Sequence, residues 1–127
     1  MAITKVTHAV LEDRYTAKAT SSATGNQNLN ASAATTFLLT GNIATAILTI
    51  QNMKLGQVID IVLSGSDLSS ASITLATNFT SATINKVGTT SIDTSKKNVI
   101  QVVCVDDTDS AAILNYSIST FEDDTTP

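Results

Sequence analysis

The chain has 127 residues, of which 43% are hydrophobic, 14% are charged and 4% are aromatic, and its formal net charge is −4. This length corresponds to about one domain with a hydrophobic core of its own. Proteins that bind phosphates need clustered Lys and Arg, so the acidic balance argues against a nucleic-acid partner. The polar residues are mostly Thr, Ser and Asn, and strong helix formers are scarce, which predicts an all-β fold.

Residues 1–34 differ in composition from the rest of the chain, and we expect them to form an extended N-terminal arm. The stretch TSSATGNQNLNASAAT consists mostly of small polar residues, which cannot bury much apolar surface. The apolar residues that precede this spacer include Ile3, Val6, Val10 and Leu11. An apolar N-terminal segment that a flexible spacer separates from the domain is better explained as a segment that docks onto another surface than as a linker without a function. These four are therefore the predicted docking residues.

Residues 35–127 are predicted to form a β-sandwich domain. Seven candidate strands alternate with polar turns, and they span residues 35–40, 45–50, 57–64, 71–76, 81–87, 99–105 and 112–120. Short strands at this spacing are typical of an antiparallel sandwich of about seven to eight strands, either jelly-roll-like or immunoglobulin-like. No βαβ spacing and no helical heptad competes with this interpretation.

Two of the predicted strands, residues 57–64 and 99–105, are apolar on both faces. An antiparallel sandwich strand should be polar outside, so a second apolar face needs a cover. The cover is either the N-terminal arm or another copy of the chain. A β-branched stripe around a central polar residue favours a symmetric contact between copies. The residues predicted for this subunit interface are Val58, Val62, Val99, Gln101, Val103 and Val105.

Residues suited to catalysis or metal binding are few. His8 is the only histidine, so one chain cannot assemble a histidine-based triad. Cys104 shares a face with Ile100 and Val102 and is expected to be a small core residue. Residues 106–109 carry three carboxylates in one turn, which suits Ca²⁺, but their spacing is not that of an EF-hand loop. We therefore predict no catalytic, cofactor-binding or metal-binding residues, and no enzymatic activity.

Targeting signals are also absent from the sequence pattern. No window approaches the ~20 apolar residues of a membrane span, and the start MAITKVTHAV lacks the apolar region of a signal peptide. The single cysteine cannot form a disulfide within the chain, so no oxidising compartment is implied. We expect synthesis in a host cytoplasm and no membrane partner.

Residues 35–119 resemble a β-module of tailed-bacteriophage virion proteins. The resemblance rests on two stretches, TFLLTGNIATAILTIQNMKLGQVIDIVLSGSDLSSASITLATNF and INKVGTTSIDTSKKNVIQVVCVDDTDSAAILNYSI. Their shared features are a strand ending in Gly-Asn, a KxGQ turn, an ITLAxNF strand, a strand ending in VDD and a closing LNYSI strand. In that family the module is a trimeric β-sandwich, found at the ends of tail fibres and in stand-alone proteins bound to the capsid.

The resemblance implies two main alternatives for function. Fibre versions often carry a Trp-Pro pair after the fourth strand and follow a long shaft, whereas this chain has LATNFTSATINKVG there and only a short arm. The expectation is therefore a capsid decoration or cement protein, a homotrimer that binds the major capsid protein on the virion surface and stabilises the head. The alternative is a tail-fibre or receptor-binding module that recognises host glycans. A third alternative is another β-sandwich, such as an enzyme or a head–tail joining protein.

Overall fold

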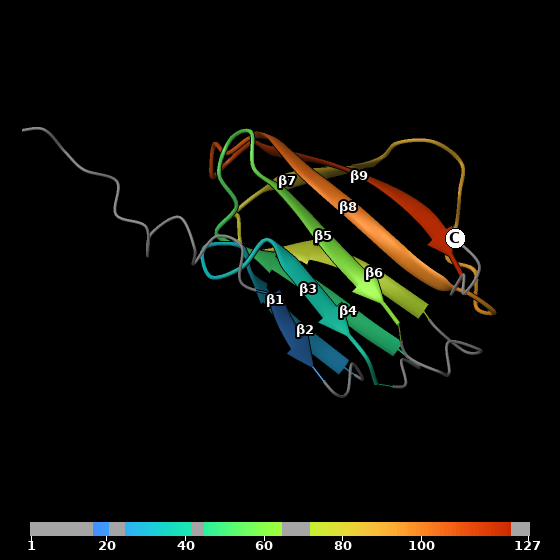
Figure 1. Ribbon diagram of the computed structural model, residues 1–127. Coiled ribbons are helices and arrows are strands. Elements are labelled where there is room, and N and C mark those ends of the chain that lie inside the picture. Colours follow the sequence, from blue (N-terminus) through green and yellow to red (C-terminus); the bar gives the residue numbers. More distant parts are fainter. Residues whose placement is uncertain (1–16, 21–24, 42–44, 65–71, 123–127) are drawn as a thin grey trace, which may run out of the picture.

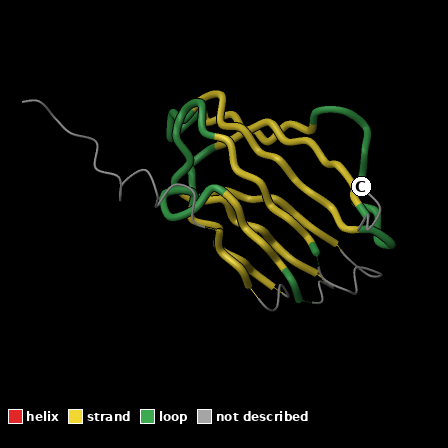
Figure 2. Tube along the Cα trace, viewed as in Figure 1, coloured by secondary structure: helices red, strands yellow, loops and turns green. Residues whose placement is uncertain are grey.

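The computed structural model describes residues 17–20, 25–41, 45–64 and 72–122. These residues form nine strands in two sheets and contain no helix (Figure 1, Figure 2). The predicted all-β fold is thus confirmed. The strands are β1 (Ala17–Thr20), β2 (Gly25–Asn30), β3 (Thr36–Leu39), β4 (Thr45–Gln51), β5 (Val58–Leu63), β6 (Ser72–Thr77), β7 (Ala82–Lys86), β8 (Lys97–Asp106) and β9 (Ala112–Phe121).

Successive strands from β1 to β6 alternate between the two sheets. The large sheet has the order β1-β3-β5-β8-β9-β7, and the small sheet has the order β2-β4-β6. All neighbouring pairs among these first six strands are parallel. The last three strands then widen the large sheet, with β8 antiparallel to both β5 and β9. Figure 1 shows the resulting two layers, with the small sheet beneath β3, β5 and β8.

The predicted antiparallel, jelly-roll-like pairing was wrong for the described strands. Five of the seven strand pairs are parallel and two are antiparallel. Parallel neighbours need a crossover connection. Among β1 to β6 each crossover is a strand of the other sheet, whereas β7 and β9 are connected through β8 of their own sheet. The turn between β4 and β5 joins the two sheets and does not form a hairpin. A jelly roll is built from antiparallel Greek keys, so its connectivity does not occur in these strands.

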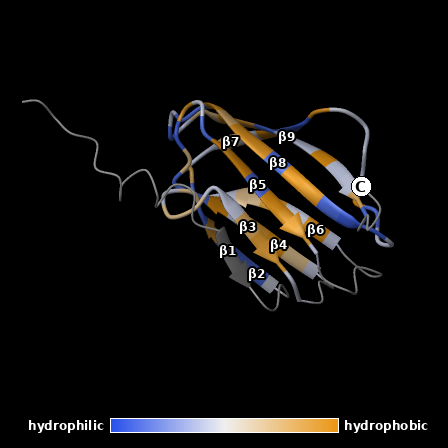
Figure 3. Cartoon of the chain, viewed as in Figure 1, coloured by the Kyte–Doolittle hydropathy of each residue, from blue (hydrophilic) through white to orange (hydrophobic). Residues whose placement is uncertain are grey.

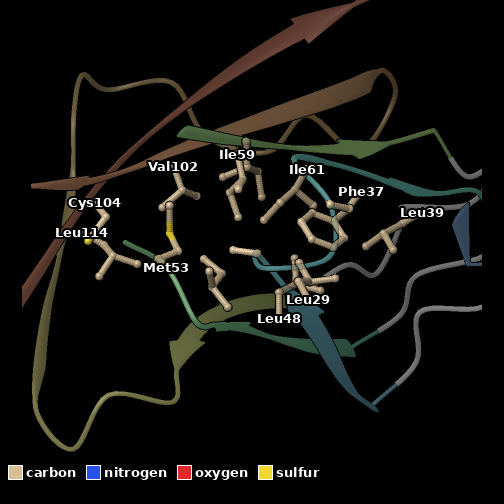
Figure 4. Close-up of a cluster of buried hydrophobic side chains, with 14 of the residues drawn as sticks. Leu29, Phe37, Leu39, Leu48, Met53, Ile59, Ile61, Val102, Cys104 and Leu114 are labelled. Carbon is tan, nitrogen blue, oxygen red and sulfur yellow. The ribbon is translucent and has the colours of Figure 1, made fainter. Parts of the chain in front are cut away.

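The hydrophobic core lies between the inner faces of the two sheets (Figure 4). Alternate residues of β4, β5 and β8 are buried, as the period of two in their sequences predicted. Phe37 and Cys104 are almost completely buried, and the burial of Cys104 confirms its predicted core position. The core side chains labelled in the figure are Leu29, Phe37, Leu39, Leu48, Met53, Ile59, Ile61, Val102, Cys104 and Leu114.

Part of the range predicted as an arm lies in the sheets. β1 pairs with β3, and β2 pairs with β4 along its whole length. Leu29, Ala31 and Ala34 are buried in the core, so residues 25–34 belong to the sandwich. The sequence GNQNLN hid this strand because only one of its residues is apolar. The outer-face residues Asn26 and Asn28 are exposed, so the strand needs little apolar sequence.

Candidate binding face

The predicted interface residues come together on the outer face of β5 and β8. These strands pair in the register Val58 to Val103, Asp60 to Gln101 and Val62 to Val99. Because side chains alternate along a strand, all six point away from the core. Val105 lies two residues beyond Val103 and is exposed, at a register shift in the β8–β9 pairing between Cys104 and Asp106. We call the following set the valine face: Val58, Asp60, Val62, Val99, Gln101, Val103 and Val105.

The valine face is apolar and open to solvent. Val58 and Val105 are each 44% exposed, and the other three valines are half-buried. Figure 3 shows long hydrophobic stretches along β5 and β8. Leu38 of β3 lies opposite Val62 and extends the apolar surface by one strand. Single exposed valines are common on monomers, but a contiguous stripe across neighbouring strands is typical of an interaction site.

Asp60 and Gln101 give the valine face a polar centre. The Nε2 atom of Gln101 donates a hydrogen bond of 3.1 Å to Oδ1 of Asp60. The sequence alone left Asp60 without an evident partner, because the register of β5 and β8 was not known. Gln101 carries an amide and cannot serve as the second carboxyl group that most glycoside hydrolases use. The hydrogen bond fixes the two side chains relative to each other.

The carboxylates of residues 106–109 do not converge on one centre. Each accepts a hydrogen bond from a different residue: Asp106 from Thr108, Asp107 from Leu55, and Asp109 from Thr80. The bonds from Thr108 and Thr80 lower the pKa of Asp106 and Asp109 respectively. Among the residues that the structure describes, no cluster of His, Cys, Asp and Glu could hold a metal ion. Asp107 and Asp109 therefore anchor their loop to the β4–β5 and β6–β7 loops, whereas Asp106 bonds within its own loop.

Cys104 lies in the core and is poorly suited to nucleophilic chemistry. Its side chain is 0% exposed, and its Sγ atom lies 3.4 Å from the carbonyl oxygen of Asp106. Burial raises the pKa of the thiol above its ordinary value. A buried thiol that stays protonated at neutral pH reacts slowly, because the thiolate is the nucleophile.

A hollow of about 600 Å³ lies beside the loop between β4 and β5. The side chain of Gln57, in its lining, forms two hydrogen bonds within the protein. Nε2 of Gln57 donates a hydrogen bond of 2.6 Å to the carbonyl oxygen of Ala31, and Oε1 of Gln57 accepts one from the N–H of Lys54. These contacts brace the loop against the end of β2.

An apolar cleft lies where the small sheet ends. The large sheet has six strands and the small sheet has three, so the inner faces of β9 and β7 extend beyond the edge strand β6. The cleft has a volume of about 290 Å³, and its lining includes Ile73, Leu75, Ile84, Ile92, Tyr116 and Ile118. Sequence reasoning missed this cleft. Alternation along residues 112–120 identifies the inner side chains, but it does not reveal how far the opposite sheet extends.

The predicted docking residues lie outside the described part of the chain: Ile3, Val6, Val10 and Leu11. The single histidine, His8, also lies outside it. In the described ranges, no helix is long and apolar enough to cross a membrane. No family model, curated protein or solved structure was found to match the chain.

Proposed function

We propose that the chain is a structural protein of a tailed-bacteriophage virion and not an enzyme. In this proposal it is a capsid decoration protein, which assembles as a homotrimer, binds the major capsid protein on the outer surface and stabilises the head. The assignment to virions rests on the resemblance of residues 35–119. The structural observation that supports it most is the valine face.

The valine face has the make-up of a protein–protein interface. β5 and β8 are the two central strands of the large sheet, so the apolar stripe runs through the middle of a broad surface. On the β9 side, the residues that pair with the valine face are polar: Asn115 lies beside Val103, Ser117 beside Gln101 and Ser119 beside Val99. The valines thus flank a polar pair, Asp60 and Gln101, and polar residues border the stripe on the β9 side. Apolar area bordered by polar residues is typical of surfaces that associate.

Association has to involve the whole face rather than one residue. Full burial of one valine side chain contributes roughly 1.5–3 kcal/mol, and these valines are already partly covered. Each therefore adds only a fraction of that amount when a second copy covers it. The sum over five valines then has to exceed the entropy cost of association, which favours a closed assembly with several contacts.

We assign the contact with the capsid to Ile3, Val6, Val10 and Leu11. Their apolar side chains precede the first described strand, β1, in the sequence. One such segment binds weakly, because ordering about ten residues costs on the order of 10 kcal/mol in backbone entropy. Three segments on one trimer bind with a high effective concentration, provided that three sites lie within reach together.

Sedimentation and particle binding test this proposal. The full chain should sediment as a trimer and should bind heads of the encoding phage that lack it. A variant without residues 2–12 should stay trimeric and lose head binding. This deletion ends before Ala17, where β1 begins, so it removes no described strand. A monomeric full chain would refute the trimer, and a truncated chain that binds heads like the parent would refute the role of the four docking residues.

Copy number separates the decoration protein from the alternative tail-fibre module. Quantitative mass spectrometry of purified virions should find the chain in numbers comparable to those of the capsid subunits. A count in the range of tail proteins would instead favour a fibre or receptor-binding role.

A further inference from the structure

A closed trimer needs two different surfaces on each copy. In a cyclic trimer the contact is heterologous, because one surface of a subunit meets another surface of the next subunit. The valine face provides the first surface. The second surface has to be apolar, has to face in a different direction, and has to complement the carboxylate at the centre of the valine face.

The open edge of the sandwich has the first two properties. We define the open edge as the part of the apolar cleft between β6 and β7 together with the lysine that ends β7: Ile73, Ile84, Lys86, Ile92, Tyr116 and Ile118. The cleft lies on the inner faces of β7 and β9 beyond the edge strand β6, whereas the valine face covers the outside of the large sheet, so one copy can use both surfaces at the same time. A heterologous contact of this kind gives a ring when the rotation between successive copies closes.

The open edge also has the complementary charge. Asp60 is the only charged residue of the valine face, and Lys86 is the only charged residue in β6 and β7. Lys86 lies two residues after Ile84, on the same side of β7, and opposite Tyr116 in the parallel pairing with β9. The lysine therefore lies at the margin of the cleft.

Both charged groups have bonding capacity left for a partner. Lys86 is exposed, and its Nζ atom donates a hydrogen bond of 3.2 Å to Oγ of Ser91. An ammonium group has three donors, and a carboxylate accepts several hydrogen bonds. Asp60 can thus keep its bond from Gln101 and accept another from a lysine of a second copy.

We propose that the open edge of one copy packs on the valine face of the next copy, with Lys86 of the first paired with Asp60 of the second. Aliphatic side chains of the cleft then cover Val58 and Val103, and three such contacts close the ring. This inference rests on the trimer proposed above and names the surfaces that form it.

Charge exchange tests the pairing of these two surfaces. Asp60→Lys and Lys86→Asp each bring like charges together, and each should raise the dissociation constant of the trimer on the order of tenfold or more. The double variant restores opposite charges and should return the dissociation constant close to that of the parent. Sedimentation velocity over a concentration series measures these constants, and circular dichroism shows whether each variant keeps the β-sheet fold.

Matched controls change the net charge by the same amounts elsewhere. Lys54→Asp alters an exposed residue of the loop between β4 and β5, and Glu122→Lys alters an exposed residue after β9. Both variants should associate like the parent. A second measurement does not depend on charge: Asp60→Cys mixed with Lys86→Cys, each in a Cys104→Ala background, should form a disulfide between subunits.

The outcomes separate this inference from the proposed function. If the parent is a trimer but the double variant stays dissociated, or if Lys86→Asp associates like the parent, the pairing is wrong and the trimer stands. A disulfide that fails to form between the two cysteine variants leads to the same conclusion. A parent that sediments as a monomer refutes both the trimer and the pairing.

Discussion

Asn52 and Asn78 bond to each other in both directions across the end of the small sheet. The backbone N–H of Asn52 donates a hydrogen bond of 3.0 Å to Oδ1 of Asn78, and Nδ2 of Asn78 donates one of 3.2 Å to Oδ1 of Asn52. Nδ2 of Asn52 also donates 2.9 Å to Oδ1 of Asn30. The three asparagines lie at the ends of β4, β6 and β2, so this chain of bonds joins all three parallel strands where they leave the sheet.

Loss of the Asn78 side chain should destabilise the fold. Asn78→Ala removes the acceptor for the N–H of Asn52 and one further bond, so the free energy of unfolding should fall by about 1–2 kcal/mol. Urea unfolding measures this change, with Thr90→Ala in an exposed loop as the control. A variant as stable as the parent would show that water replaces both bonds at no cost.

The backbone of Asn52 allows a separate prediction. Its φ angle is 60°, in the left-handed region that Asn and Gly tolerate better than other residues. Asn52→Gly loses the side-chain bonds but keeps this conformation, whereas Asn52→Ala also introduces strain. The Ala variant should therefore be about 1 kcal/mol less stable than the Gly variant in urea unfolding. Equal stability of the two variants would contradict the argument from backbone strain.

Asp109 should contribute to the loss of stability in acid. Its carboxylate accepts hydrogen bonds from the hydroxyl and N–H of Thr80, which lower its pKa in the folded chain. As the pH falls, Asp109 therefore binds a proton in the unfolded chain before it does so in the folded chain. The hydrogen bonds with Thr80 thus stabilise the folded chain at neutral pH. This stabilisation is lost as the pH falls from the ordinary range of Asp, near ~3.9, through the lowered folded pKa.

Asp109→Asn removes this titration. The difference in unfolding free energy between about pH 7 and about pH 3 should be smaller in the variant than in the parent. Asp93 and Asp106 also have lowered pKa values, so part of the dependence on pH should remain. Urea unfolding at both pH values measures the difference. An unchanged dependence would show that the bonds with Thr80 do not distinguish the folded from the unfolded chain.

The sequence predicted which faces are buried better than it predicted which strands are neighbours. Alternation places Ile59 and Ile61 inside and Val58 outside without knowledge of the fold, because it depends only on the strand period. Pairing depends on residues far apart in the chain, such as Phe37 beside Ile61. Short polar turns are compatible both with hairpins and with crossings between sheets. For this reason the antiparallel prediction failed although most strands were found.

The same distinction applies to the candidate sites. The valine face could be predicted because Val58 and Val103 break the expected alternation on their own strands. The open edge could not, because the partial exposure of Tyr116 and Ile118 results from the narrower opposite sheet. The partner of Asp60 was likewise hidden until the register placed Gln101 beside it.

Cys104 should react with thiol reagents only when the chain opens. Its side chain is completely buried and burial raises its pKa, so little thiolate is present or accessible in the folded chain. Labelling with an aromatic disulfide reagent at about pH 8 should be slow in the native protein and fast in denaturant. Phe37→Ala, which opens a cavity in the core and costs about 3–5 kcal/mol, should accelerate native labelling. Fast labelling of the parent would place Cys104 in a region that opens locally.

Val103 tests whether the valine face forms the subunit contact. Val103 lies opposite Val58 in the β5–β8 pairing and is half-buried in the free subunit. Val103→Asp adds a carboxylate to the apolar stripe, and covering it without a partner costs several kcal/mol per subunit. We expect this variant to be a folded monomer at concentrations where the parent is a trimer. Val103→Thr has a similar shape and no charge, so it should weaken association much less.

Asn28→Asp is the control for the added charge, because Asn28 is exposed on the outer face of the small sheet, away from both proposed surfaces. Sedimentation equilibrium should find this variant trimeric, like the parent, and circular dichroism should show the same β-sheet content for all three variants. If Val103→Asp stays trimeric at the parent's concentrations, the valine face is exposed in the trimer. The subunits then have to meet through another surface, and the apolar stripe on β5 and β8 becomes free to bind the capsid directly.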